Sequence, residues 1–229
     1  MNIWLILILV AGISLFFFYA SYSMRSGVYI KTLNRNPKAG NVVALTFDDG
    51  PDPVQTLKIL DILKEHDIQA CFFSIGRKIT GNEDIIRRMK AEGHLVGNHS
   101  FAHSNKFPLY SLKRMIADLK ACGDELARIT GCETSLFRPP YGVSNPTIAR
   151  AVKKMKYTVI GWNIRTFDTC SGSIEKIVKR VDKKLSPGSV ILLHDTMDFS
   201  DILLKSILAM LKQRCYKVIS IDELFNFNF

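Results

Sequence analysis

The start of the chain lacks charged side chains altogether. None occurs between Asn2 and Tyr22, and this run is almost wholly apolar. A helix of about twenty such residues can cross the hydrocarbon core of a bilayer. A buried core helix and a cleaved signal peptide are the alternatives, but no basic stretch precedes the run and the sequence around Ala20 is a poor cleavage site. We therefore predict an N-terminal transmembrane anchor or uncleaved signal segment over residues 1–22.

The chain also lacks the cysteine spacings of common metal and redox motifs. Its five cysteines include no Cys-x-x-Cys pair, which excludes a zinc ribbon and a thioredoxin-type motif. Internal repeats and low-complexity tracts are absent as well. The 229 residues suffice for one domain with a full-sized core.

Acidic residues are in deficit, and the net charge is +10. Because the apolar run carries none of this charge, all of it belongs to the remainder of the chain. A basic domain beside a membrane would be attracted to anionic lipid head groups or anionic polymers. No nucleic-acid recognition motif accompanies the charge. We expect no nucleic acid as partner, and no feature indicates an obligate protein partner.

Strand-type and helix-type segments alternate from residue 41 onward, after a juxtamembrane linker at 23–40. The expected strands cover 41–47, 70–75, 94–97, 136–137, 157–161, 189–193 and 217–219. The expected helices cover 54–66, 82–92, 111–129, 145–155, 173–186 and 200–214. This alternation predicts an α/β domain over 41–229 with parallel strands, in an open sheet or a barrel. In such folds the chemistry lies at the C-terminal ends of the strands.

Two of these strand ends carry candidate metal ligands. Asp48 and Asp49 end the first strand, where two buried carboxylates would repel each other unless a cation lay beside them. His99 and His103 follow the third strand four residues apart, and we expect one helical turn to place both imidazoles on the same face. Two histidines and one carboxylate suit catalytic zinc or non-haem iron.

Three other strand ends carry candidate acid–base and oxyanion groups. Arg138 opens a proline-stiffened turn to Gly142; it could pair with a carboxylate, and backbone N–H groups in such a turn can face a developing oxyanion. Asp168 follows the strand at 157–161, and His194 follows a fully apolar strand as an acid–base candidate. Together the five strand ends predict metal-assisted hydrolysis of an acyl group.

The motifs TFDDGPD, HSFAH, RPPYG and LLHD resemble, in order and spacing, those of the polysaccharide deacetylase family. These proteins are the carbohydrate esterases with the NodB homology domain, carbohydrate esterase family 4. The resemblance covers roughly residues 41–225. It implies a distorted (β/α) barrel of about seven strands, preceded here by the N-terminal hydrophobic helix.

The resemblance also implies a role for each matching residue. Asp49, His99 and His103 would bind a divalent metal, for which we expect zinc with cobalt or nickel able to replace it. Asp48 would be the general base, held by Arg138. The Tyr141 N–H would stabilise the oxyanion, and His194 would be the general acid, tuned by Asp168. Substrate contacts are expected from Tyr141, Leu192 and Trp162.

Two positions depart from the family pattern. Thr169 stands where the family often has tryptophan, and Arg165 stands where many members have an acidic residue. Both would alter the wall of the sugar site, so they bear on substrate identity more than on the chemistry.

The expected reaction is removal of acetyl from N-acetylglucosamine units of a polymer, with peptidoglycan the first candidate and chitin-type oligomers the next. An O-acetyl esterase on xylan-like glycans would need the same site. A non-haem iron oxygenase and a catalytically silent glycan-binding module are alternatives of other classes.

Two arguments about membrane orientation conflict. Arg25, Lys31, Arg35 and Lys38 follow the apolar segment, and by the positive-inside tendency they would leave the domain in the cytoplasm. Long domains can translocate despite flanking charge, and the polymer that the resemblance implies lies outside the cytoplasmic membrane. We therefore predict a single-pass protein of the cell membrane with an extracytoplasmic domain.

Overall fold

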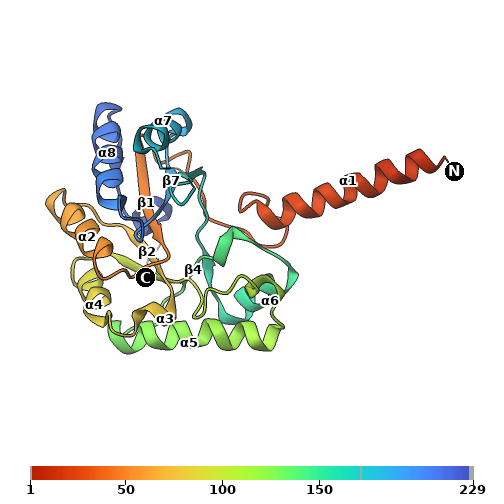
Figure 1. Cartoon of the computed structure of the whole chain (residues 1–229), viewed down its shortest axis with the longest axis horizontal. Coiled ribbons are helices and arrows are strands. Elements are labelled where there is room, and N and C mark those ends of the chain that lie inside the picture. The colour runs from red at the N-terminus through yellow and green to blue at the C-terminus, as the bar shows by residue number, and fades with distance from the viewer. Residues whose placement is uncertain (1, 171, 227–229) are drawn as a thin grey trace.

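The computed structural model describes residues 2–170 and 172–226 and shows alternating strands and helices (Figure 1). The strands are β1 (Val42–Asp48), β2 (Cys71–Ser74), β3 (Leu95–Asn98), β4 (Leu136–Phe137), β5 (Thr158–Val159), β6 (Ile164–Arg165), β7 (Ser189–His194) and β8 (Lys217–Val218). The α-helices are α1 (Ile3–Tyr22), α2 (Gln55–Glu65), α3 (Gly76–Ile79), α4 (Glu83–Ala91), α5 (Leu112–Thr130), α6 (Pro146–Met155), α7 (Ile174–Lys184), α8 (Ser200–Gln213) and α9 (Ile221–Phe225). Two short 3₁₀ turns span Phe107–Leu109 and Pro140–Gly142.

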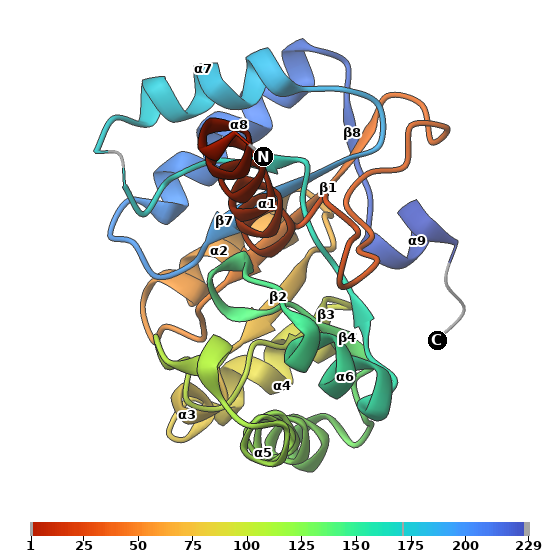
Figure 2. The same cartoon turned by 90° about the vertical axis from the view of Figure 1, so that its right-hand side faces the viewer.

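The strands form one curled parallel sheet in the order β5-β4-β3-β2-β1-β7-β6, with β8 paired to the start of β1. Residues 33–36 pair with the chain just after β5 and with the start of β7. Leu33 forms a parallel bridge with Ile160, and Arg35 forms an antiparallel bridge with Ser189. The result is a half-barrel with helices on its outside (Figure 2). It confirms the predicted α/β fold of a distorted barrel.

Alternation along the strands separates two hydrophobic layers. In β1 the side chains of Val43, Leu45 and Phe47 pack outward in the cluster that includes residues of α2, α4, α7 and α8. Ala44 packs on the inner side of the curled sheet in a second cluster. Because side chains along a strand alternate between faces, Asp48 shares this inner side. The same alternation in β7 turns His194 inward.

The α1 helix projects from the body as a separate arm (Figure 1). Its mean hydropathy of 2.6 and its 20 residues are sufficient to cross a membrane, and Ala20 is its one buried residue within the described chain. The segment 23–40, expected as a linker, packs against the domain. Met24 and Ile30 are buried in the same cluster as Phe137.

Three elements differ from the sequence prediction because each is too short to leave a periodic pattern. They are the helices α3 and α9 and the strand β6, which has only two residues. The strand expected over 157–161 is also limited to Thr158–Val159. The backbone carbonyls of Ile160 and Gly161 accept hydrogen bonds from Arg138 instead.

Candidate metal and acid–base site

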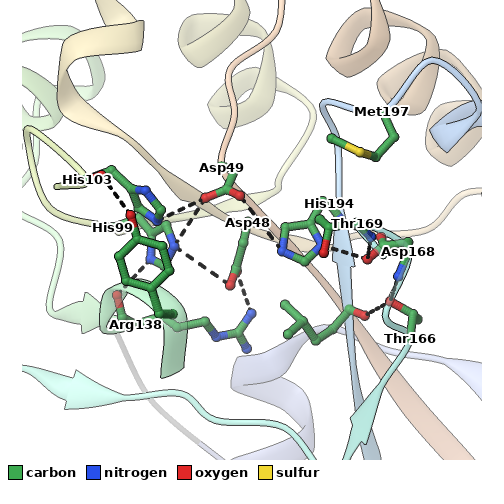
Figure 3. A network of polar contacts seen from close by, with 12 residues as sticks. Asp48, Asp49, His99, His103, Arg138, Thr166, Asp168, Thr169, His194 and Met197 are labelled. Carbon is green, nitrogen blue, oxygen red and sulfur yellow. Dashed lines mark hydrogen bonds and ion pairs between the residues drawn. The ribbon is translucent and has the colours of Figure 1, made fainter. Parts of the chain in front are cut away.

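The parallel register of β1 and β7 brings the first two site residues together. Asp48 is the register partner of His194 at the C-terminal ends of these strands. The next residue, Asp49, has a φ of 76°, which breaks the strand's alternation and lets its carboxylate take a separate direction. Figure 3 shows Asp49 between His99 and His103 on one side and His194 on the other. The two neighbouring aspartates therefore have different partners.

Arg138 is wholly buried and fixes Asp48. Its Nη1 donates to Asp48 Oδ1 at 2.6 Å and to Thr46 Oγ1 at 2.9 Å. Nε and Nη2 donate to the carbonyls of Ile160 and Gly161 at 2.9 and 3.0 Å, and the guanidinium lies 4.2 Å from the centre of the Phe73 ring. A buried arginine with every nitrogen engaged is rigid, so Asp48 is held with Oδ2 turned toward His99 Nε2, at 3.9 Å.

His99 and His103 face Asp49, but they do not lie on a helical turn. Residues 99–103 form a loop in which Ser100 and His103 have φ values of 67° and 44°. The expected helical turn is therefore wrong, although the two imidazoles do converge. Their Nε2 atoms lie 3.5 and 3.2 Å from Asp49 Oδ1.

The donor set of these three residues fits a divalent metal. One ligand atom from each lies within 4.8 Å of the others. His99 Nδ1 is 2.8 Å from the Arg138 carbonyl; it donates there, leaving the Nε2 lone pair free to ligate. Asp49 Oδ1 is buried and has no hydrogen-bond partner among the described residues, as expected of an oxygen that ligates a cation.

Charge and burial act against each other at this cluster. Burial opposes ionisation of Asp49, but the neighbouring imidazoles of His99, His103 and His194 hold its pKa far below the usual value. Burial, aided by the neighbouring charge of His99, lowers the pKa of His103 to about 4. A neutral His103 imidazole and an ionised Asp49 are the forms that bind metal.

His194 and Asp168 form a hydrogen-bonded ion pair beside the metal cluster. His194 Nδ1 donates to Asp168 Oδ1 at 2.7 Å, and the His194 backbone N–H donates to Asp168 Oδ2 at 2.8 Å. Burial would lower the pKa of His194, but the hydrogen bond and charge of Asp168, with the charges of Asp48 and Asp49, raise it to about 9. His194 is therefore an imidazolium at neutral pH, with Nε2–H directed toward Asp49 Oδ2 at 3.9 Å.

Of the three expected substrate contacts, Tyr141 lies beside the metal cluster. It has a φ of 62°, its hydroxyl donates to the His103 carbonyl at 3.2 Å, and its ring centre lies 4.8 Å from that of His103. Trp162 packs beneath this turn, where a Cβ on Gly142 would come within 2.4 Å of the indole. Leu192 is 2% exposed. Contact of these three residues with substrate, and the Tyr141 N–H in an oxyanion hole, stay predictions.

Several supporting residues are not predictable from strand ends. Asp118 on α5 accepts hydrogen bonds from the N–H groups of Phe101 and Ala102 at 2.9 and 3.2 Å, and so holds the histidine loop. Thr56 on α2 donates to the buried Asp195 carboxylate at 2.6 Å. For Thr46 the sequence gives a weak indication of a polar partner, since it is the single polar residue inside an apolar strand.

The positions that depart from the family pattern lie on the strand β6 and in the loop that follows it. The Arg165 guanidinium lies over the rings of Phe167 and Trp162 at 4.8 and 6.0 Å. The Thr169 backbone N–H donates to Asp168 Oδ1 at 3.1 Å. Neither side chain joins the metal cluster.

The fold and the site together define a class of protein. It is a parallel α/β half-barrel whose strand ends carry a cluster of two histidines and one aspartate, with the Asp48 carboxylate and the His194 imidazolium beside it. The family model for polysaccharide deacetylases matches residues 35–160. The chain is 32% identical over 198 residues to a peptidoglycan-N-acetylglucosamine deacetylase of Bacillus cereus, covering 83% of this chain and 91% of that protein. This chain belongs to the polysaccharide deacetylase family, carbohydrate esterase family 4.

Two further relatives bear on substrate and fold. The peptidoglycan-N-acetylmuramic acid deacetylase PdaC of Bacillus subtilis is 34% identical over 194 residues, and the match covers 85% of this chain but 40% of that longer protein. A solved peptidoglycan N-acetylglucosamine deacetylase superposes with a TM-score of 0.79 at 30% identity, covering 85% of this chain and 92% of that one. The family thus includes deacetylases named for both sugars of peptidoglycan.

Proposed function

We propose that this protein is a metal-dependent deacetylase that hydrolyses the acetamide of N-acetylglucosamine units in a polysaccharide, with peptidoglycan as the first candidate and chitin-type oligomers as the next. One observation carries the proposal. Asp48 and His194 are register partners at the ends of paired strands and point to the same side of the sheet, with Asp49 and its two histidines beside them. A carbonyl bound between Asp48 and His194 would have a base on one side and an acid on the other.

The residues on each side suit opposite proton transfers. Asp48 Oδ1 is engaged by Arg138, which leaves Oδ2 to accept a proton from the attacking water. His194 is an imidazolium at neutral pH and would donate its Nε2 proton to the nitrogen of the departing amine. Asp168 would keep the imidazole ring oriented through Nδ1 and stabilise its charge. The N–H of Tyr141 would donate to the carbonyl oxygen as negative charge develops there.

Asp49, His99 and His103 would hold the metal. When bound, a divalent cation would polarise the acetyl carbonyl and lower the pKa of water. We propose zinc, with cobalt or nickel able to replace it, because one carboxylate and two imidazoles are ligands of intermediate softness. Metal analysis of protein purified without added metal tests this choice. Zinc near one equivalent supports it, and iron alone contradicts it.

Acetate release separates the proposed amidase from its rivals. The purified protein is given N-acetylated and O-acetylated oligosaccharides of equal length, with and without a chelator. Chelator-sensitive acetate release from the N-acetylated chain supports the proposal. Activity on esters alone would favour an O-acetyl esterase, oxygen consumption without acetate a non-haem iron oxygenase, and binding without turnover a silent glycan-binding module.

We also propose that α1 anchors the protein in the cell membrane with the domain outside. The length and hydropathy of α1 support the anchor, and the peptidoglycan substrates named for relatives support the orientation. Protease added to intact spheroplasts should digest the domain. Full protection until the membrane is permeabilised would contradict the orientation.

A further inference from the structure

The last turn of α1 is hydrogen-bonded to the segment that carries Tyr141. Ala20 is fully buried, and its carbonyl accepts hydrogen bonds from the hydroxyls of Ser144 and Ser26 at 3.2 and 3.1 Å. The Ser21 carbonyl accepts from the Ser144 backbone N–H at 2.8 Å. The end of the apolar helix therefore contacts the rim of the proposed active site directly.

The chain enters the domain immediately after α1. Met24 is 5% exposed, its side chain lies against Gly142, and its carbonyl accepts a hydrogen bond from Thr32 Oγ1 at 2.5 Å. Ile30 is buried in the same cluster. A free tether over residues 23–40 could extend to about 60 Å. Because this segment is packed against the domain, it cannot extend in this way, and the domain stays next to α1.

We propose that α1 is a docked anchor that holds the active site at the membrane surface, so that the substrate is acetylated glycan which a lipid holds in the same membrane. This inference rests on the proposed deacetylase function. At 1.5 Å per residue α1 is about 30 Å long, which matches the hydrocarbon core. The membrane surface then falls near Tyr22, beside the contacts that Ala20 and Ser21 make with Ser144.

A short series of contacts connects this surface to the metal cluster. Met24 packs against Gly142, the neighbouring Tyr141 ring packs on His103, and His103 faces Asp49. Three side-chain contacts of this kind span roughly 10–20 Å. Glycan joined to a membrane lipid lies within this distance, whereas glycan deep in a cell wall does not. The exposed Arg25 at this level would also attract anionic head groups.

Reconstitution into vesicles tests the proposal. The full chain is placed in phosphatidylglycerol–phosphatidylethanolamine vesicles with an N-acetylated disaccharide that is either lipid-linked in the same bilayer or free in solution. The measured quantity is the ratio of kcat/KM for the lipid-linked over the free substrate. Ala20→Trp inserts a wedge between α1 and Ser144, and Phe18→Trp, at a position that is 62% exposed, is the matched control.

A second undocked form guards against misfolding of Ala20→Trp. In it an unrelated apolar helix and a flexible Gly-Ser linker replace residues 1–22, so the anchor remains but the contacts with Ser144 are lost. Docking itself is measured by oxidation of a Ser21→Cys, Ser144→Cys pair in the vesicles. The hydrogen bond between the two backbones keeps these residues side by side when α1 is docked.

We expect the wild type and Phe18→Trp to share a ratio at least tenfold above that of both undocked forms, which should keep their rate on the free disaccharide within about twofold. The engineered disulfide should form. Three outcomes would overturn the docked anchor and leave the deacetylase function untouched. They are equal ratios in docked and undocked forms, failure of the disulfide to form, and recovery from cells of a chain that lacks residues 1–22. Absence of acetate from both substrates would overturn the deacetylase function as well.

Discussion

Replacing Asp168 by asparagine removes the charge that keeps His194 protonated, so its effect on activity should grow with pH. Burial would lower the pKa of His194, but the hydrogen bond and charge of Asp168, with the charges of Asp48 and Asp49, raise it from 6.5 to about 9. A shift of about 2.5 pH units corresponds to about 3 kcal/mol. With a pKa of about 9, about nine-tenths of His194 carries its proton at pH 8. If the pKa returns to 6.5 in Asp168→Asn, only about 3% of His194 carries its proton at pH 8.

The expected loss in kcat/KM for Asp168→Asn from deprotonation is therefore about 30-fold at pH 8 and less than twofold at pH 6. The assay is acetate release over this pH range, with metal content measured in parallel. Asp84→Asn, which alters an exposed carboxylate (95% side-chain exposure), controls for the change in charge. An equal loss at every pH, or an alkaline limb that does not move, would refute the role of Asp168 in holding the proton on His194.

Three further predictions concern buried groups around the site and the core. Arg138→Met should lower the free energy of unfolding by about 3–5 kcal/mol, because Asp48 is left buried and unpaired; an unchanged denaturation midpoint would contradict this. Burial keeps the pKa of His94 at about 4, so stability should fall by about 2 kcal/mol from pH 7 to pH 5, and this part of the slope should disappear in His94→Asn. Gly50→Ala should reduce turnover by about 10²-fold, since its Cβ would lie 2.2 Å from an Asp195 oxygen; near-normal rates would show that this turn can relax.

The strand-end residues are predictable from sequence because parallel strands place their C-terminal ends on one edge of a sheet. Asp48 and His194 illustrate this: each ends an apolar run, and the two runs pair in register. Arg138 is predictable as a partner for a carboxylate, but its bonds to Ile160 and Gly161 are not. Those bonds depend on where β5 ends, and a two-residue strand has no periodicity to read.

Contacts between distant segments leave no local signal in the sequence. Asp118 looks like any solvated acid on an amphipathic helix, yet it accepts the two N–H groups that shape the histidine loop. The four-residue spacing of His99 and His103 suggests a helix, but positive φ values at Ser100 and His103 bring the rings together in a loop. Packing of Met24 and Ile30 likewise comes from tertiary contacts, since the composition of 23–40 is that of a linker.

Separate replacement of the two adjacent aspartates tests the central claim most directly. Zinc content and kcat/KM for acetate release are measured on Asp48→Asn and Asp49→Ala. Asp49→Ala should lose both metal and activity, because Asp49 faces His99 and His103. Asp48→Asn should keep metal and substrate affinity but lose about 10²–10⁴-fold in turnover. A metal-free Asp48→Asn beside a metal-loaded Asp49→Ala would contradict the account, as would near-normal turnover in Asp48→Asn.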